Sequence, residues 1–281
     1  MGSTLVAVMT EAARRCGAGF SSTCTSAGTT TSLIDLLAAD EGVDESFAQG
    51  GWILRPNAVA AGDRLRRINA AAFTPSTGAW GIGRAWTNAP ANGEAYYVFS
   101  MLPPTEMPGI PESWKRLVNR ALAATYYDDE ITVGFGDGTQ DRFTIADETG
   151  WVAREQHIRG VLLRTQNDDG TVTDIDQGKN GRYWRIQHGA QGPQVVLSRI
   201  PSGTQAVVLS VVRTYQPLSA FDDETNCPLD LAALRTRYEL YCYLDAASQS
   251  VGQYKAEKER ALRDWRIEYG GHQPANAVVM S

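Results

Sequence analysis

The feature that most constrains the fold is a repeated alternation of short apolar runs with turn residues, broken once by a helical stripe. Apolar runs of strand length recur from Phe47 to Met101 and again from Ile131 to Tyr215. Gly136-Asp137-Gly138 and Asn167 to Gly170 each separate two such runs, and Asp-Gly in this setting predicts a hairpin. Between the two regions, Glu112 to Tyr126 carries apolar residues at helical spacing. The pattern predicts an α+β fold in which two mainly antiparallel β-modules, each a small barrel or sandwich, bracket an amphipathic helix.

Helices are also expected near both ends of the chain. Thr4 to Cys16 has helical apolar spacing, with basic residues in its last turn and a glycine just beyond. Leu229 to Tyr269 keeps the helical period, with Asn226 as the expected cap and Gly252 as the point where the long helix bends or splits. Gly19 to Thr31, rich in Ser, Thr and Gly, is expected to be an unstructured arm that becomes ordered against a neighbouring subunit. The chain therefore divides into five expected segments: N-terminal helix and Thr-rich arm (1–44), first β-module (45–102), linker and helix (103–128), second β-module (129–220), and C-terminal helix and tail (221–281).

The composition is that of a globular protein, and the charge argues against tight binding of nucleic acid. Of the 281 residues, 43% are hydrophobic and 21% are charged, which suffices for sizeable cores. The net charge of −6 argues against a surface with many phosphate contacts, because such surfaces need clustered Lys and Arg. No apolar run approaches the roughly 18 residues that span a bilayer, so we expect a soluble protein with no membrane partner. The four cysteines form no Cys-x-x-Cys pair and are expected to be idle thiols in a reducing compartment.

Residue patterns that mark enzymes and metal sites are not found in the sequence. His157, His188 and His272 stand in no metal-binding pair, and the acidic clusters match no calcium loop. There is no Gly-x-Ser-x-Gly elbow, and the segment around Lys179 lacks the spacing of a phosphate loop. We therefore expect no enzymatic activity, no cofactor and no bound metal.

Aromatic residues in the first β-module allow two interpretations. Trp52, Trp80, Trp86 and Tyr96 could form a platform for a sugar, but aromatic residues at strand spacing are more often core. The glycine pair before Trp52, Gly50-Gly51, is expected to supply turn geometry, with Trp52 filling a barrel core or an interface.

With these elements placed, the chain resembles a neck or head-to-tail connector (adaptor) protein of tailed bacteriophages. The resemblance rests on four stretches that together touch most of the chain. They are the N-terminal helix with the arm ending TSAGTTTSLID (Thr25 to Asp35), the module beginning GGWILRP (Gly50 to Phe99), the helix WKRLVNRAL (Trp114 to Leu122) and the helix start CPLDLAALRTRYELYCYL (Cys227 to Leu244).

The resemblance implies a structural virion protein that acts by assembly. It implies a homo-oligomeric ring, expected to be a dodecamer, that lies beneath the portal protein and contacts tail or neck proteins. DNA then passes through the extended channel only as cargo. Many adaptors are small helical proteins without two β-modules, so a tail or baseplate protein is an alternative, and a carbohydrate-binding β-module is another.

Two sets of residues are candidates for these contacts. Subunit or partner interfaces are expected at the Thr-rich arm and at the far end of the last helix, through Thr29, Thr30, Thr31, Leu262 and Trp265. Acidic turns that repel DNA are expected to face the channel, at Asp128, Asp129, Glu130, Asp168, Asp169, Asp222, Asp223 and Glu224.

Overall fold

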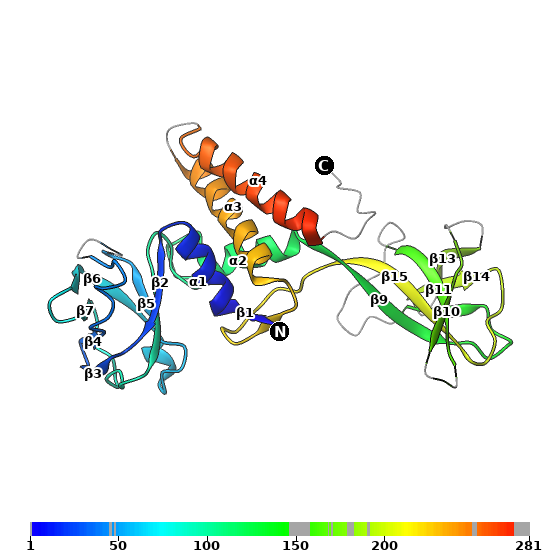
Figure 1. Ribbon diagram of the computed structural model, residues 1–281, viewed down its shortest axis with the longest axis horizontal. Coiled ribbons are helices and arrows are strands. Elements are labelled where there is room, and N and C mark those ends of the chain that lie inside the picture. Colours follow the sequence, from blue (N-terminus) through cyan, green and yellow to red (C-terminus); the bar gives the residue numbers. More distant parts are fainter. Residues whose placement is uncertain are drawn as a thin grey trace. The chain divides into compact units, whose positions relative to one another are not determined.

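The chain folds into two compact units. The computed structural model describes residues 2–44, 47, 49–145, 158–167, 169, 171–178, 183–189, 192–248 and 252–272 (Figure 1). Among these, unit 1 comprises residues 2–125 and 215–272, and unit 2 comprises the described residues between 126 and 214. Unit 2 is thus an insertion in the chain of unit 1. The described residues form helices and antiparallel sheets, so the predicted α+β class is confirmed. The finer division into five segments stays a prediction.

The helices of unit 1 begin and end close to where the sequence placed them. Helix α1 (Leu5–Arg15) starts after Thr4, whose hydroxyl accepts a hydrogen bond from the Ala7 N–H at 3.3 Å. Helix α2 (Trp114–Ala123) is capped in the same way by Ser113, so Glu112 precedes the helix and does not lie in its first turn.

The long C-terminal helix is split, as predicted. It forms α3 (Leu229–Ala247) and α4 (Lys255–His272), and Gly252 between them has a φ of 81°, a conformation that favours glycine. The expected cap Asn226 is wrong, because Pro228 occupies the N-cap position and no side chain caps the helix. Ion pairs between Arg237 and Asp264 and between Lys258 and Asp245 show that α4 folds back along α3.

In its described residues, unit 1 contains a seven-stranded antiparallel sheet. Its strand order is β2 (Gly19–Thr23), β8 (Ala95–Phe99), β5 (Trp52–Leu54), β6 (Leu65–Thr74), β7 (Ala79–Ile82), β4 (Ser32–Ile34) and β3 (Ser26–Thr29). The first and last strands of this order, β2 and β3, are joined by Cys24 and Thr25 alone, so the sheet curls back on itself. A short pair, β1 (Ser3–Thr4) with β16 (Glu224–Thr225), ties the start of α1 to the segment before α3, and η1 (Ala61–Asp63) is a single 3-10 turn.

The expectation of an unstructured arm at Gly19 to Thr31 is wrong. This segment supplies β2, which pairs with β8, and β3, which pairs with β4. Phe20 and Cys24 are buried in the interior of the curled sheet. The Ser, Thr and Gly residues of these two strands are half-buried or exposed.

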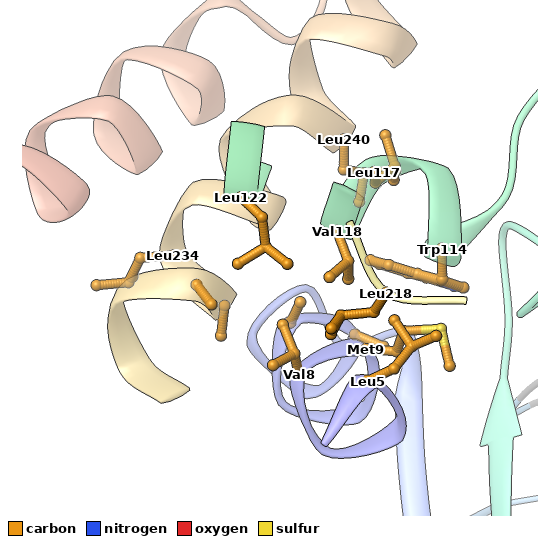
Figure 2. Close-up of a cluster of buried hydrophobic side chains, with 14 of the residues drawn as sticks. Leu5, Val8, Met9, Trp114, Leu117, Val118, Leu122, Leu218, Leu234 and Leu240 are labelled. Atoms are coloured by element: carbon orange, nitrogen blue, oxygen red, sulfur yellow. The ribbon is translucent and has the colours of Figure 1, made fainter. Parts of the chain in front are cut away.

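The sheet of unit 1 separates two hydrophobic cores, because successive residues of a strand point to opposite faces. On β5, Ile53 belongs to the core inside the curled sheet, whereas Leu54 belongs to the core beneath the helices. Figure 2 shows this second core, in which side chains from α1, α2 and α3 converge. Its labelled members include Leu5, Val8 and Met9 of α1, Trp114, Leu117, Val118 and Leu122 of α2, and Leu234 and Leu240 of α3.

The described residues of unit 2 form two antiparallel sheets around one core. The four-stranded sheet has the order β12 (Val172–Asp176), β11 (Ile158–Gln166), β15 (Gln205–Thr214) and β9 (Tyr126–Phe135). The three-stranded sheet has the order β10 (Arg142–Thr144), β14 (Gly192–Leu197) and β13 (Trp184–Gly189). Both sheets contribute to a single apolar cluster that contains Leu163, Trp184 and Leu209.

One of the two predicted hairpins of unit 2 is confirmed and the other is wrong. Strands β11 and β12 pair across the turn that begins at Asn167. Strands β9 and β10 do not pair across Gly136-Asp137-Gly138: β9 pairs with β15, and β10 pairs with β14. Asp137 accepts hydrogen bonds from the N–H groups of residues 139 and 140 in the connection, and Phe143 packs against Gly134.

Removing a side chain from the helical core should destabilise unit 1. We expect Leu117→Ala to lower the free energy of unfolding by about 2–5 kcal/mol, because Leu117 is fully buried and the cavity cannot refill. Urea titration followed by tryptophan fluorescence measures this, since Trp52, Trp80, Trp86, Trp114 and Trp265 lie in unit 1. The control Leu36→Ala, at a side chain 55% exposed, should change stability by less than about 0.5 kcal/mol. Equal effects of the two substitutions would show that Leu117 is not part of a packed core.

Candidate interaction sites

A chain of buried hydrogen bonds crosses the interior of the curled sheet. The Trp80 indole N–H donates to the Tyr96 hydroxyl at 3.0 Å, and this hydroxyl donates to the Asp35 carboxylate at 2.8 Å. The other Asp35 oxygen accepts from the Leu37 N–H at 3.0 Å. Burial, together with the hydrogen bond to Asp35, raises the pKa of Tyr96, so it stays protonated and keeps donating. This chain of hydrogen bonds therefore fixes the backbone at residues 35–37 from inside the core.

The aromatic residues that were candidates for a sugar platform are all buried. Trp52, Trp80, Trp86 and Tyr96 are between 0 and 7% exposed. The sugar-platform interpretation of these residues is wrong, because a sugar ring needs an accessible aromatic face to stack on. Gly50 has a φ of 70°, so the glycine pair does supply turn geometry before β5, as expected.

A second polar network holds the connection between β7 and β8. The Arg55 guanidinium makes two hydrogen bonds to the Glu94 carboxylate, at 2.7 and 2.8 Å, and lies 4.8 Å above the Trp86 ring. Asp63 is fully buried and accepts hydrogen bonds from the N–H groups of residues 87 and 88 and from Arg66.

Both carboxyls of this network are held ionised. Burial opposes ionisation of Asp63, but the backbone donors of residues 87 and 88 outweigh it and lower its pKa. The same balance at Glu94, with Arg55 as the main opposing group, lowers the pKa of Glu94. Each charged group is matched by partners of its own chain, so this network anchors a loop.

Three of the four thiols are held in their unreactive protonated form. Burial raises the pKa of Cys24 and of Cys227 to about 12, and the pKa of Cys16 to about 11. None of the four cysteines forms a disulfide. Within the described residues, no group of three or more His, Cys, Asp or Glu side chains is arranged to hold a metal ion. No helix of the described part is long and apolar enough to cross a membrane.

The acidic residues 128–130 lie in a strand and not in a turn, contrary to expectation. They belong to β9, and each carboxylate forms an ion pair with an arginine of β11 or β15. The pairs are Asp128 with Arg159 at 3.1 Å, Asp129 with Arg213 at 2.8 Å, and Glu130 with Arg164 at 2.7 Å. Burial also raises the pKa of Asp128. These three residues hold the sheet together and are poor candidates for a surface that repels DNA.

The remaining acidic candidates differ among themselves. Asp223 accepts hydrogen bonds from the N–H groups of residues 219 and 220 and so stabilises its own turn. Asp169 accepts a hydrogen bond from the N–H group of residue 171 and stabilises its turn in the same way. Asp222 and Glu224 are exposed. Asp168 lies outside the described residues. Asp169, Asp222 and Glu224 are exposed, whereas Asp223 is half-buried, so the first three remain the candidates for an acidic surface.

The two expected interface anchors on the last helix have different environments. Trp265 is only 9% exposed and stacks on Tyr269, with the Arg235 guanidinium 4.7 Å from its ring. The expectation that Trp265 lies beyond the compact modules is therefore wrong, because α4 folds back onto α3. Leu262 is half-buried and lines a shallow hollow on α4 together with Glu259, Arg263, Arg266 and Ile267. Because Leu262 lines this hollow, it remains a candidate for an interface.

Thr29 ends β3, and Thr30 and Thr31 form an exposed turn before β4. The Thr29 hydroxyl lies 2.8 Å from the Ser32 hydroxyl, and the Thr30 carbonyl accepts a hydrogen bond from the Trp86 N–H at 2.7 Å. Thr31 also bonds through its carbonyl, to the Ile82 N–H. Their hydroxyls stay exposed, so a neighbour would meet a preformed polar turn.

No protein-family model matches the chain, and no curated protein matches it.

Removing the Tyr96 hydroxyl tests the buried hydrogen-bond chain. Tyr96→Phe leaves Trp80 without its acceptor and takes one donor from the buried Asp35, which should cost about 1–3 kcal/mol of stability. Tyr97→Phe, one residue along β8, removes a hydroxyl with no described hydrogen bond and is the matched control. Denaturant titration of both variants measures the difference, and equal stabilities would contradict a structural role for the chain.

Lowering the pH should destabilise unit 1 through the polar network of Arg55, Asp63 and Glu94. The folded pKa values of Asp63 and Glu94 are lowered from 3.8 and 4.5, so their contribution is complete above these values. It is lost as the pH falls from these values through the lower folded values, because the unfolded state then binds more protons than the folded state. We expect the urea midpoint of the wild type to fall more steeply below about pH 4.5 than that of Asp63→Asn/Glu94→Gln. The control Asp222→Asn should show the same pH dependence of the urea midpoint as the wild type. If the double variant also showed the wild-type pH dependence, the network would not be the cause of the acid sensitivity.

Proposed function

We propose that the chain is a structural subunit of a tailed-bacteriophage virion, in the head-to-tail connector ring that joins the portal to the tail. Its partners are further copies of itself, the portal protein and tail or neck proteins. DNA passes through the ring as cargo. This function requires a rigid body with several exposed contact surfaces and no reaction centre.

The observation that carries the proposal is that the four stretches behind the resemblance meet in unit 1. The N-terminal helix, WKRLVNRAL and CPLDLAALRTRYELYCYL become α1, α2 and α3, whose side chains share one core (Figure 2). The remaining stretches, Thr25 to Asp35 and Gly50 to Phe99, supply strands β3 to β8 of the curled sheet. Leu54 and Phe99 of that sheet join the same helical core. Stretches that are far apart in the sequence therefore pack together in one compact unit.

The use of polar residues also supports an assembly role. Asp35, Asp63 and Arg55 are buried groups of the kind that enzymes use, and Glu94 is half-buried, but each is occupied by hydrogen bonds that fix a loop or a turn. Large apolar side chains, by contrast, lie on the surface: Leu36, Leu37 and Ile267 are 55, 56 and 72% exposed. Leu36 and Leu37 are neighbours, and contiguous exposed apolar side chains are typical of contact surfaces.

Passage of DNA favours acidic over basic channel walls. A wall of unpaired arginines would hold the duplex by counterion release, whereas carboxylates repel phosphate. Asp169, Asp222 and Glu224 are the described candidates for such a wall, since Asp128, Asp129 and Glu130 are paired with arginines.

The mass of the purified protein tests the proposal. Native mass spectrometry of the chain alone, and mixed with the cognate portal protein, should give a closed oligomer of one defined copy number in at least one of the two samples. A monomer in both samples would contradict the connector role. Binding to a tail protein but not to the portal would favour the tail or baseplate alternative, and a monomer that binds glycans would favour the carbohydrate-binding one.

A further inference from the structure

Unit 1 carries two exposed apolar surfaces of opposite charge. We propose that these surfaces bind each other between neighbouring copies of the chain and so form the repeating contact of the ring. The first, the acidic patch, consists of Leu36, Leu37, Asp40 and Glu41. The second, the basic hollow, consists of Leu262, Ile267, Arg263 and Arg266 with Glu259 at its edge. The inference rests on the proposed function and names its subunit interface.

The acidic patch is held rigid from inside the sheet. Asp35 receives a hydrogen bond from Tyr96 and accepts another from the Leu37 N–H, while the Leu36 N–H donates to the Thr25 hydroxyl at 2.8 Å. The backbone under both leucines is therefore fixed, although their side chains are more than half exposed. Asp40 and Glu41 follow within one turn and are exposed without a described ion pair. A partner that binds here loses little conformational entropy in ordering the patch.

The basic hollow lies on α4 beside the face that packs against α3, and its Leu262 is half-buried against the helical core. Ala261 and Trp265 point into the core and are 0 and 9% exposed, whereas Ile267 is 72% exposed. Glu259 lies 4.0 Å from Lys255, but Arg263 and Arg266 form no ion pair with a described residue. The hollow therefore presents an apolar floor beneath two unneutralised guanidinium groups.

The two surfaces match each other in chemistry. Two leucines flanked by two carboxylates fit an aliphatic hollow flanked by two arginines, and opposite charges at an interface select the partner and fix its register. Both surfaces belong to unit 1, where Figure 1 shows β4, the strand just before the acidic patch, well apart from α4. One compact unit cannot fold its two surfaces onto each other, so the match is between copies. A contact between two different surfaces is heterologous, and its repetition forms a ring when the rotation between neighbouring copies closes.

Charge reversal tests the pairing in the full-length chain. Arg263→Glu/Arg266→Glu and Asp40→Lys/Glu41→Lys each place like charges opposite each other. Each should raise the protein concentration at half-assembly by at least about tenfold. Combining all four substitutions in one chain should restore assembly, as should mixing the two double variants. Arg14→Glu/Arg84→Glu applies the same charge change at exposed arginines outside both surfaces and should assemble like the wild type.

The outcomes separate this inference from the proposed function. If the wild type forms a ring and either double reversal assembles equally well, the pairing is overturned and the connector role stands. If both reversals block assembly but their combination does not restore it, the two surfaces contact other partners and the pairing is again overturned. If the wild type forms no oligomer alone or with the portal protein, both proposals fail. Circular dichroism melting of every variant identifies any that has lost its fold.

Discussion

Burial of the apolar stripe of α1 is the interaction on which unit 1 depends. Leu5, Val8, Met9 and Ala12 are fully buried, and α1 contacts α2, α3 and the strands β2 and β8. Each large aliphatic side chain of this kind contributes about 1.5–3 kcal/mol on burial. Because α1 lies between the sheet and the other helices, the same side chains join the two halves of a unit that the chain leaves at residue 125 and re-enters at residue 215. The position of α3 and α4 therefore depends on a helix more than 200 residues earlier in the sequence.

The buried polar groups extend this rigidity to the surface. Asp35 fixes the turn that displays Leu36 and Leu37, and Asp63, Arg55 and Glu94 fix the loop before β8. A surface fixed before binding has less conformational entropy to lose, so a few aliphatic and charged groups suffice for a specific contact when it is repeated around a ring. The same polar groups in an enzyme would face a substrate, but here they face backbone N–H groups and one another.

The sequence predicted what depends on neighbouring residues and missed what depends on distant ones. Helix α1 and the break at Gly252 follow from local periodicity and turn chemistry, and both are predicted correctly. The segment from Gly19 to Thr31 was taken for an arm, because its strand partner β8 lies more than 70 residues away and its Ser and Thr content is typical of loops. Asp128, Asp129 and Glu130 were taken for a turn because carboxylates are rare in strands, whereas arginines 31 to 84 residues away neutralise them. Trp265 was taken for an exposed anchor, because nothing local shows that α4 folds back onto α3. Leu262, the other interface residue predicted on the last helix, does line the exposed hollow.

The central claim is that this rigid body repeats around an axis. Electron microscopy of the full-length protein mixed with its portal tests the claim most directly, because class averages in end-on view count the copies and show whether the particle closes. The account predicts a closed ring with a single rotational symmetry, coaxial with the portal and open at its centre. Particles that contain the portal alone, or open chains of irregular length, would contradict it.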